Sequence, residues 1–169
     1  MNTLELQIDD RGVAIITIDL PDRSVNVVSP ELTDDLEAAV NQVLADESIV
    51  GAVLTSGKSS FIVGADLTEL VHDYAKGMTA AEASHRFDRN MQLQRRMETG
   101  GKPFACAING MALGGGLEIA LACHYRVLAD DSKAMVGLPE VNVGLLPGGG
   151  GTQRLPRMIG VENALPLLL

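Results

Sequence analysis

Alternating apolar and polar residues at the start of the chain predict a pair of strands. Residues 4–8 follow the two-residue period of a strand that buries one face. A turn at Arg11-Gly12 leads into residues 13–18, which are almost all apolar, as in a strand covered on both faces. The pattern therefore predicts a β-hairpin whose second strand is well buried.

A helix and a further strand follow the hairpin. Ser29 is a suitable N-cap, Pro30 suits the first helical position and Glu31 adds a first-turn acid. Apolar side chains then recur at helical spacing to about Asp46, namely Leu32, Leu36, Val40, Val43 and Leu44. The apolar run at 51–55 ends in a turn, so the order is strand, helix, strand, as in a βαβ crossover.

The rest of the chain continues in the same alternation. A partly exposed helix is predicted at 79–98, and a second helix starts at the triple glycine 114–116. Short strands are predicted at 104–108 and 125–129. The 169 residues suffice for one core, and no repeat or linker-like stretch divides them. The sequence therefore predicts an α/β fold with a single domain at residues 1–169.

Charge and composition exclude several classes of function. A net charge of -9, a pI near 4.7 and 3% aromatic residues argue against binding to nucleic acid or to an anionic membrane surface. No apolar run is long enough to span a membrane, and the first ten residues do not resemble a signal peptide. Cys106 and Cys123 lie in apolar segments, so buried reduced thiols are expected. These features predict a cytoplasmic protein.

The sequence does not match several common functional motifs. Residues 51–59 look like a phosphate-binding loop, but five residues separate the first glycine from Gly57-Lys58-Ser59 where the motif needs four. His72, His85 and His124 have no partners at catalytic or metal-ligand spacing. We therefore interpret the histidines as surface or satisfied core residues and predict no metal site.

Glu118 is an acid in an apolar setting. It follows the glycines 114–116 by two residues, between Leu117 and Ile119, in a run that is apolar up to Cys123. A solvent-facing acid in the first helical turn is common, because the helix dipole favours it. The apolar neighbours instead indicate a buried helix, where an unpaired carboxylate is costly and is a candidate for function.

Glu140 is a second acid between apolar residues, and a four-glycine turn at 148–151 follows it. Glycine turns permit positive φ, and the backbone N–H groups at a helix start can stabilise an oxyanion, although a plain tight turn explains each glycine cluster equally well. Taken together, two acids and donor-rich turns suit general acid and base chemistry on a substrate whose carbonyl gains negative charge.

Longer segments make the pattern specific. They are Phe-Ile-Val-Gly-Ala-Asp-Leu at 61–67, Ile-Asn-Gly-Met-Ala-Leu-Gly-Gly-Gly-Leu-Glu at 108–118, Pro-Glu at 139–140 and Gly-Leu-Leu-Pro at 144–147. This ordered set spans nearly the whole chain and resembles the enoyl-CoA hydratase/isomerase (crotonase) superfamily. The resemblance implies a crotonase-like ββα spiral fold and an acyl-CoA thioester substrate.

Within the superfamily, the chain is most similar to the N-terminal hydratase domain of the multifunctional fatty-acid oxidation α-subunit. Cys123-His124 and a longer segment before 137–140 carry this similarity. Domains of the family continue well past residue 169 into helices that cover the acyl pocket, and the chain ends on the apolar residues 164–169. We therefore expect a chain that lacks the family's C-terminal helices, or one whose end is covered.

The resemblance assigns roles to particular residues. The backbone N–H groups of Ala65 and Gly115 match the oxyanion hole for the thioester oxygen. Glu118 and Glu140 match the two glutamates that hold the attacking water, and the choice between acid and base stays open. Members specialised for shifting a double bond often keep only the acid that matches Glu140, so hydration is favoured over isomerisation.

Binding of CoA is expected along two further segments. By resemblance, these are the loop 23–26, with Ser24 and Val25, and the segment from Ala65 through Asp66 to Leu67. The resemblance implies no cofactor beyond the CoA of the substrate. The implied partners are copies of the chain in a homo-oligomer or, in a full-length protein, a docked dehydrogenase domain and a thiolase subunit.

Three functions remain open on the sequence alone. The first is an enoyl-CoA hydratase, supported by both acids and both oxyanion segments. The second is a Δ3-Δ2 enoyl-CoA isomerase, which product analysis would distinguish. The third, of a different class, is a catalytically silent CoA-binding fragment, suggested by the missing C-terminal helices.

Overall fold

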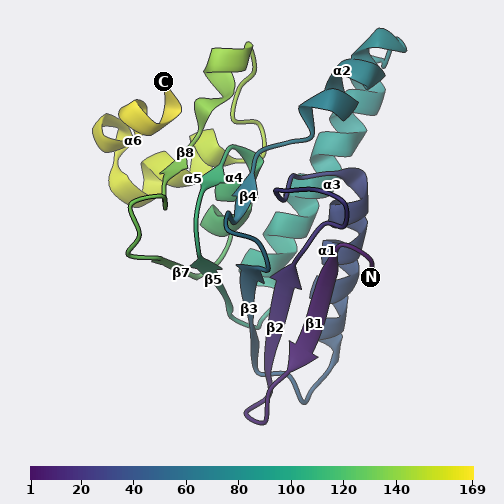
Figure 1. The fold of residues 1–169 in the computed structure, drawn as a ribbon, viewed down its shortest axis with the longest axis vertical. Coiled ribbons are helices and arrows are strands. Elements are labelled where there is room, and N and C mark those ends of the chain that lie inside the picture. The colour runs from purple at the N-terminus through teal and green to yellow at the C-terminus, as the bar shows by residue number, and fades with distance from the viewer.

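Two β-sheets organise the chain. The computed structural model describes the backbone of residues 1–169 and every side chain except that of residue 86. The larger sheet has five strands in the order β1-β2-β3-β5-β7, and the smaller one has three in the order β4-β6-β8. Figure 1 shows the smaller sheet beyond one end of the larger sheet, close to the helices of the C-terminal third. The predicted α/β class is confirmed.

The larger sheet contains the predicted hairpin and crossover. Strands β1 (Leu4–Ile8) and β2 (Val13–Ile18) pair antiparallel, and β2 then pairs parallel with β3 (Gly51–Ser56). Strands β5 (Phe104–Ile108) and β7 (Tyr125–Leu128) extend the sheet in parallel. All five strands lie where the hydrophobic pattern predicted them.

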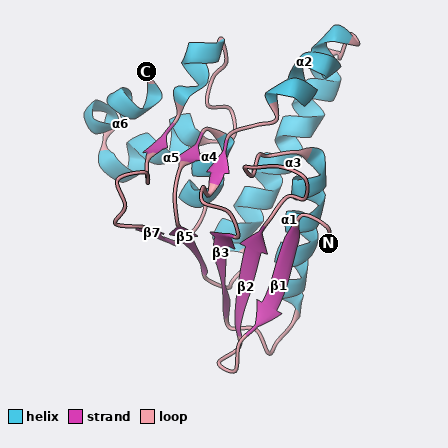
Figure 2. Ribbon diagram, in the orientation of Figure 1, coloured by secondary structure: helices cyan, strands magenta, loops and turns pink.

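Helices α1 (Pro30–Ala45) and α3 (Ala80–Thr99) pack side by side, and Figure 2 shows them behind the larger sheet. Ser29 caps α1 as predicted, because its hydroxyl accepts a hydrogen bond from the Leu32 N–H at 3.2 Å. Thr79 and Glu82 form a reciprocal capping box at the start of α3. Apolar side chains of α1, α3 and the sheet form the core, among them Ile16, Leu36, Leu54, Met97 and Phe104.

The smaller sheet lies in the segments quoted for the family resemblance. Its parallel strands are β4 (Ile62–Val63), β6 (Ala112–Leu113) and β8 (Val136–Gly137). Helix α4 (Gly115–Leu121) follows β6 directly, and a 3-10 helix, η1 (Pro139–Val143), follows β8. The structure thus begins α4 at the predicted glycines but ends it at Leu121, two residues short of the expected Cys123.

Three helices were not predicted. Asp66 caps α2 (Leu67–Ala75) by accepting hydrogen bonds from the N–H groups of Thr68 and Glu69. Helices α5 (Gly151–Ile159) and α6 (Val161–Leu168) each contain an internal proline, and four glycines at 148–151 lead into α5. These residues usually mark turns, so local pattern disfavours helix where the fold forms it.

The end of the chain is only partly exposed. Leu169 is 77% exposed, whereas Leu167 and Leu168 are half-buried against the core. The carbonyl of Leu167 accepts a hydrogen bond from the Leu138 N–H at 2.8 Å, which fastens α6 beside η1. None of the described helices is long and apolar enough to cross a membrane.

Candidate active site

Strand register places Ala65 and Gly115 at equivalent positions. Parallel strands β4 and β6 pair Ile62 with Ala112 and Val63 with Leu113. Ala65 and Gly115 each follow the end of their strand by two residues, and both lie beside Val28: Ala65 forms a bridge with Val28, and a Cβ atom on Gly115 would lie 3.2 Å from a Val28 side-chain carbon. A Cβ atom on Gly114 would lie 3.5 Å from the Gly64 Cα, so the two backbone segments run close together at this level. From the sequence, the association of Ala65 with Gly115 rested on the family resemblance alone.

The N–H groups of Ala65 and Gly115 have no hydrogen-bond acceptor within the described part of the chain. On either side of Ala65, the Gly64 carbonyl and the Asp66 N–H are both bonded to the backbone of Val28. The N–H of Gly114 donates to the Gly137 carbonyl at 2.9 Å. Two unpaired donors at the same level can bind one oxygen that gains negative charge.

Glu118 is buried, as its apolar neighbours indicated. Its side chain comes from the first turn of α4, and the residue is 5% exposed. The expectation of an unpaired carboxylate is wrong, because Glu118 Oε1 accepts a hydrogen bond from the Gly151 N–H at 2.9 Å. A buried carboxylate requires such a donor, and here it comes from a segment 33 residues further along the chain.

The four-glycine turn is shaped around the Glu118 carboxylate. A Cβ atom on Gly149 would lie 2.3 Å from Glu118 Oε2, and one on Gly151 would lie 3.1 Å from Oε1. Gly150 has a φ of 106°, in the left-handed region that side chains rarely adopt. Position 150 therefore suits glycine by backbone conformation, and a side chain at 149 or 151 would displace the carboxylate from its present position.

Glu140 lies in η1, and its side chain approaches Gly114. Its Oε1 is 2.9 Å from the position that a Cβ on Gly114 would take. Its Oε2 is buried and has no hydrogen-bond partner among the described residues. A buried, unpartnered carboxylate oxygen is costly unless a ligand or water binds to it. The position beside Gly114, the N-cap of α4, brings Glu140 to the helix that carries Glu118.

Both carboxyls have raised pKa values. Burial raises the pKa of Glu118 above its ordinary value, and the negative charge of Glu140 adds to that rise while the Gly151 N–H opposes it. Burial also raises the pKa of Glu140. Raised pKa values make both carboxyls better proton acceptors than free carboxylates, which suits general acid and base chemistry.

The segments expected to bind CoA border a cavity of about 510 Å³. Arg23 and Asp66 line it, together with Thr68 and His72 of α2. Arg23 and Asp66 also form an ion pair at 2.6 Å, so the Asp66 carboxylate is already engaged. Ser24 and Leu67 are exposed and Val25 is half-buried. The structure thus brings the two predicted segments together around one cavity.

Sequence reasoning missed Arg154 and the donor role of Gly151. Arg154 of α5 donates to the Gly149 carbonyl at 3.0 Å and pairs with Glu98 of α3. The run of four glycines was the available signal, but spacing does not show which carboxylate such a turn faces. The expectation for the cysteines is confirmed, since Cys106 and Cys123 are both buried free thiols.

Comparison with known proteins identifies relatives of the chain. Residues 9–169 match the family model described as enoyl-CoA hydratase/isomerase. The fatty acid oxidation complex subunit alpha of Shewanella amazonensis is 45% identical over 168 residues. That match covers 99% of this chain and 23% of the relative, so the chain spans about a quarter of the relative's length.

Solved structures agree with the fold. The enoyl-CoA hydratase of Bacillus anthracis superimposes with a TM-score of 0.86 at 33% identity, covering 98% of this chain and 62% of that one. A structure from Geobacillus kaustophilus with the same description superimposes with a TM-score of 0.89 at 28% identity, covering 99% of this chain and 61% of the other. The predicted crotonase-like fold is therefore confirmed.

Proposed function

Since the chain belongs to the enoyl-CoA hydratase/isomerase family, we propose that it hydrates trans-2-enoyl-CoA to 3-hydroxyacyl-CoA in fatty-acid β-oxidation. The observation that carries this proposal is the placement of Glu118 and Glu140 around Gly114, beside the unpaired N–H groups of Ala65 and Gly115. This arrangement offers two proton-transfer groups and two donors for one oxygen.

In the proposed reaction, the backbone N–H groups stabilise negative charge and the two glutamates transfer protons. The thioester oxygen would accept hydrogen bonds from the Ala65 and Gly115 N–H groups, which stabilise the negative charge that develops as water attacks. Water held by Glu118 and Glu140 would form a bond to C3 and lose a proton to one of these carboxylates. The other carboxyl would supply the proton that C2 gains, so the sum is addition of one water.

Hydration is favoured over isomerisation by the number of acids. Isomerisation needs one group that carries a proton from one carbon to another. Hydration needs groups that hold the water, remove a proton from it as its oxygen bonds to C3, and deliver a proton to C2. The unpartnered Glu140 Oε2 and the buried Glu118 together supply acceptors for such a water. The isomerase therefore becomes an outcome of the test below.

The wider setting is also a proposal. We place residues 1–169 in one catalytic domain that needs no cofactor, because both proton-transfer groups and both oxyanion donors come from this chain. CoA would enter only as part of the substrate and would lie along Ser24, Val25, Asp66 and Leu67. We also propose a cytoplasmic location, self-association, and docking to a dehydrogenase domain and a thiolase subunit. The relatives, which are named alpha subunits of a fatty acid oxidation complex, support a place in such a complex.

The direct test follows the absorbance of the enoyl thioester after a short trans-2-enoyl-CoA is mixed with the protein. We expect the absorbance to fall, and Glu118→Gln and Glu140→Gln each to slow the reaction by about 10²- to 10⁴-fold, the usual contribution of a general acid or base. Glu47→Gln, an exposed residue far along the chain from both, is the matched control and should keep the wild-type rate.

The outcomes separate the three functions. An unchanged absorbance with trans-2-enoyl-CoA, together with a rise when a trans-3-enoyl-CoA is supplied, would replace the hydratase by the isomerase. Binding of the thioester with neither change would instead indicate a silent CoA-binding domain. Wild-type rates in both glutamate variants would contradict the assignment of the two acids even if hydration occurs.

A further inference from the structure

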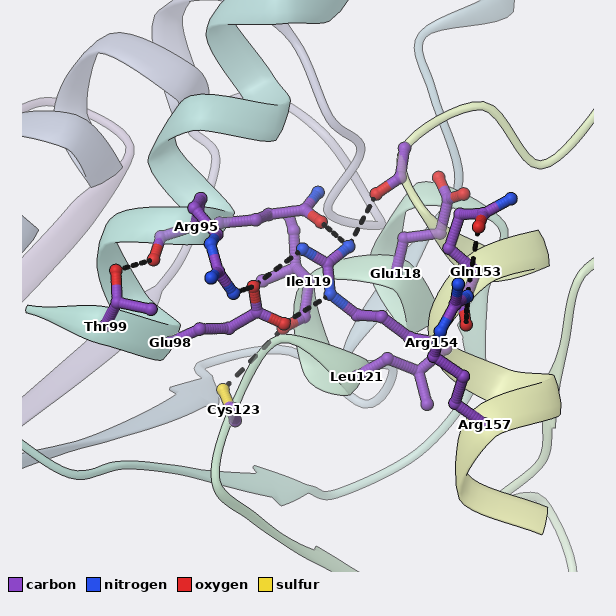
Figure 3. Close-up of polar contacts among 12 residues, drawn as sticks. Arg95, Glu98, Thr99, Glu118, Ile119, Leu121, Cys123, Gln153, Arg154 and Arg157 are labelled. Carbon is purple, nitrogen blue, oxygen red and sulfur yellow. Dashed lines mark hydrogen bonds and ion pairs between the residues drawn. The ribbon is translucent and has the colours of Figure 1, made fainter.

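Arg154 joins three parts of the molecule beside the candidate site. Its Nε and Nη2 donate to the two carboxylate oxygens of Glu98, at 2.7 and 3.2 Å. Its Nη1 donates to Gln94 Oε1 at 2.7 Å and to the Gly149 carbonyl at 3.0 Å. Figure 3 shows the guanidinium reaching from α5 towards Glu98, whereas Arg157 of the same helix is turned towards Gln153. The planar guanidinium is thus held by two residues of α3 while it holds the glycine turn.

The hydrogen bond from Arg154 to Gly149 connects Arg154 with the turn that contacts Glu118. Gly149 packs against Glu118 Oε2, and the N–H of Gly151, two residues further on, donates to Glu118 Oε1. The intervening Gly150 has positive φ, and a Cβ there would meet Arg154 Nη1. The turn itself is flexible in principle, because glycine restricts the backbone least. Its shape beside Glu118 therefore depends on what holds it from outside.

We propose that Arg154 is a positioning residue for Glu118, which it acts on through the glycine turn 149–151, with Glu98 and Gln94 of α3 as its fixed support. The inference rests on the proposed hydration, since it assigns a cause to the placement of one of the two acids. Arg154 does not hydrogen-bond Glu118 itself. It sets where the Gly151 N–H lies and hence where the carboxylate is held.

The surroundings of Arg154 support this role over that of a surface ion pair. The side chains of Arg154 and Glu98 are 16% and 24% exposed, and Gln94 is 4% exposed. A bidentate ion pair between arginine and a carboxylate restrains the guanidinium more than a single hydrogen bond does. A lysine at 154 has one ammonium on a flexible stem, so it could keep the charge but not all of these bonds.

Arg154 also acts on Glu118 by its charge. The charged groups around Glu118 are Glu140 from η1 and Arg154 from α5, with Glu98 of α3 behind Arg154. The negative charge of Glu140 raises the pKa of Glu118, and the positive charge of Arg154 lowers it. Glu98 offsets part of the Arg154 charge. Replacement of Arg154 and replacement of Glu98 should therefore move the Glu118 pKa in opposite directions.

The experiment compares Arg154→Gln, Arg154→Lys, Glu98→Gln and the control Arg157→Gln in the whole chain. For Arg154→Gln we expect kcat to fall roughly 10- to 100-fold with KM within about threefold, because a displaced acid costs turnover more than binding. Arg154→Lys should recover part of that loss. Arg157 is exposed and bonds only within α5, so Arg157→Gln should keep the wild-type kcat.

Titration of the Glu118 carboxyl by carbon NMR, assigned with Glu118→Gln, gives a readout that a merely structural role would not produce. The midpoint should move to higher pH in Arg154→Gln and to lower pH in Glu98→Gln. Equal midpoints in all variants, or a wild-type kcat in Arg154→Gln below its melting temperature, would overturn the proposal. If the wild-type protein does not hydrate enoyl-CoA, the proposed function fails, yet the Glu118 midpoint in Arg154→Lys still decides the role of Arg154. Lysine keeps the charge, so a midpoint displaced from the wild type supports positioning through the turn, whereas a wild-type midpoint means that Arg154 acts by charge alone and overturns the proposal. Arg154→Lys and Glu98→Gln keep the test open if Arg154→Gln does not fold.

Discussion

At the scale of single residues, Glu118 combines a cost to folding with a candidate catalytic role. A carboxylate with 5% exposure loses most of its hydration, and one N–H donor replaces only part of it. The nearby Glu140 adds repulsion when both groups are ionised. Stability and activity therefore make opposite demands on this position, as is common at catalytic sites.

This conflict predicts a pH-dependent effect of Glu118→Gln on stability. Burial raises the pKa of Glu118 in the folded protein above its unfolded value of about 4.5, so the folded state binds more protons once the pH exceeds that value. The wild-type protein thus loses stability as the pH rises from about 4.5 through the folded pKa. We expect Glu118→Gln to raise Tm at pH 8, by about 2–4 °C for each kcal/mol gained, and to lose this advantage near pH 4.

Thermal unfolding at a series of pH values measures the effect. Glu47→Gln, at an exposed position, should follow the wild-type curve throughout. A Glu118→Gln protein less stable than the wild type at pH 8 would mean that the hydrogen bond from Gly151 outweighs the cost of burying the charge. That result would contradict the predicted sign.

At the scale of elements, Asn26 links the two sheets. Its Nδ2 donates to the Ile18 carbonyl at the end of β2 and to Ser56 Oγ at the end of β3, both at 2.9 Å. Its backbone carbonyl accepts from the Val63 N–H of β4 at 2.9 Å. Asn26 is fully buried, so these bonds replace contacts with water. The link fixes the loop expected to bind CoA against the strand that leads to Ala65.

Replacing this link should be costly for the fold. Asn26→Ala leaves several buried polar partners unsatisfied, so we expect the free energy of unfolding to fall by about 2–4 kcal/mol, given about 1–3 kcal/mol for each such group. Asn163→Ala, at an exposed site in α6, should change it by no more than about 0.5 kcal/mol. Urea unfolding of both variants measures the difference. Equal midpoints would show that the side-chain hydrogen bonds of Asn26 do not contribute to stability.

At the scale of the whole molecule, stability is unevenly distributed. The core lies between the larger sheet and helices α1 and α3, whereas α2 contains no buried residue. Figure 1 shows α2 at the far end of the molecule from the hairpin turn between β1 and β2. Elements with few buried contacts open locally without global unfolding. Because α2 borders the cavity lined by Arg23 and Asp66, this opening would occur beside the expected CoA segments.

Hydrogen exchange should reveal this difference. We expect the amides of β2 and β3 to exchange only through near-global opening, and those of α2 to exchange at least on the order of 100-fold faster. Addition of a CoA thioester should slow exchange in α2 if the ligand lies against it. Uniform protection across α2 and the central strands in the free protein would contradict the uneven distribution.

Much of the fold was determined by local sequence. The five strands of the larger sheet and helices α1 and α3 follow from hydrophobic period and capping residues, because these signals act between neighbours along the chain. The burial of Glu118 also followed from its apolar neighbours. Helices α5 and α6 could not be predicted in this way, since each contains a proline that only packing against the rest of the fold makes acceptable.

The arrangement of the candidate site was decided by tertiary structure. The sequence indicated two acids and several glycine turns, and a family resemblance paired them, but spacing along the chain does not measure distance in space. The pairing of β4 with β6 brings the segments that end in Ala65 and Gly115 together, and the chain returns 33 residues after Glu118 to supply the Gly151 N–H. The contact of Arg154 with this glycine turn could be identified only from the tertiary structure. Hydrogen bonds between distant segments depend on where the sheets and helices place the backbone, and no local pattern encodes that placement.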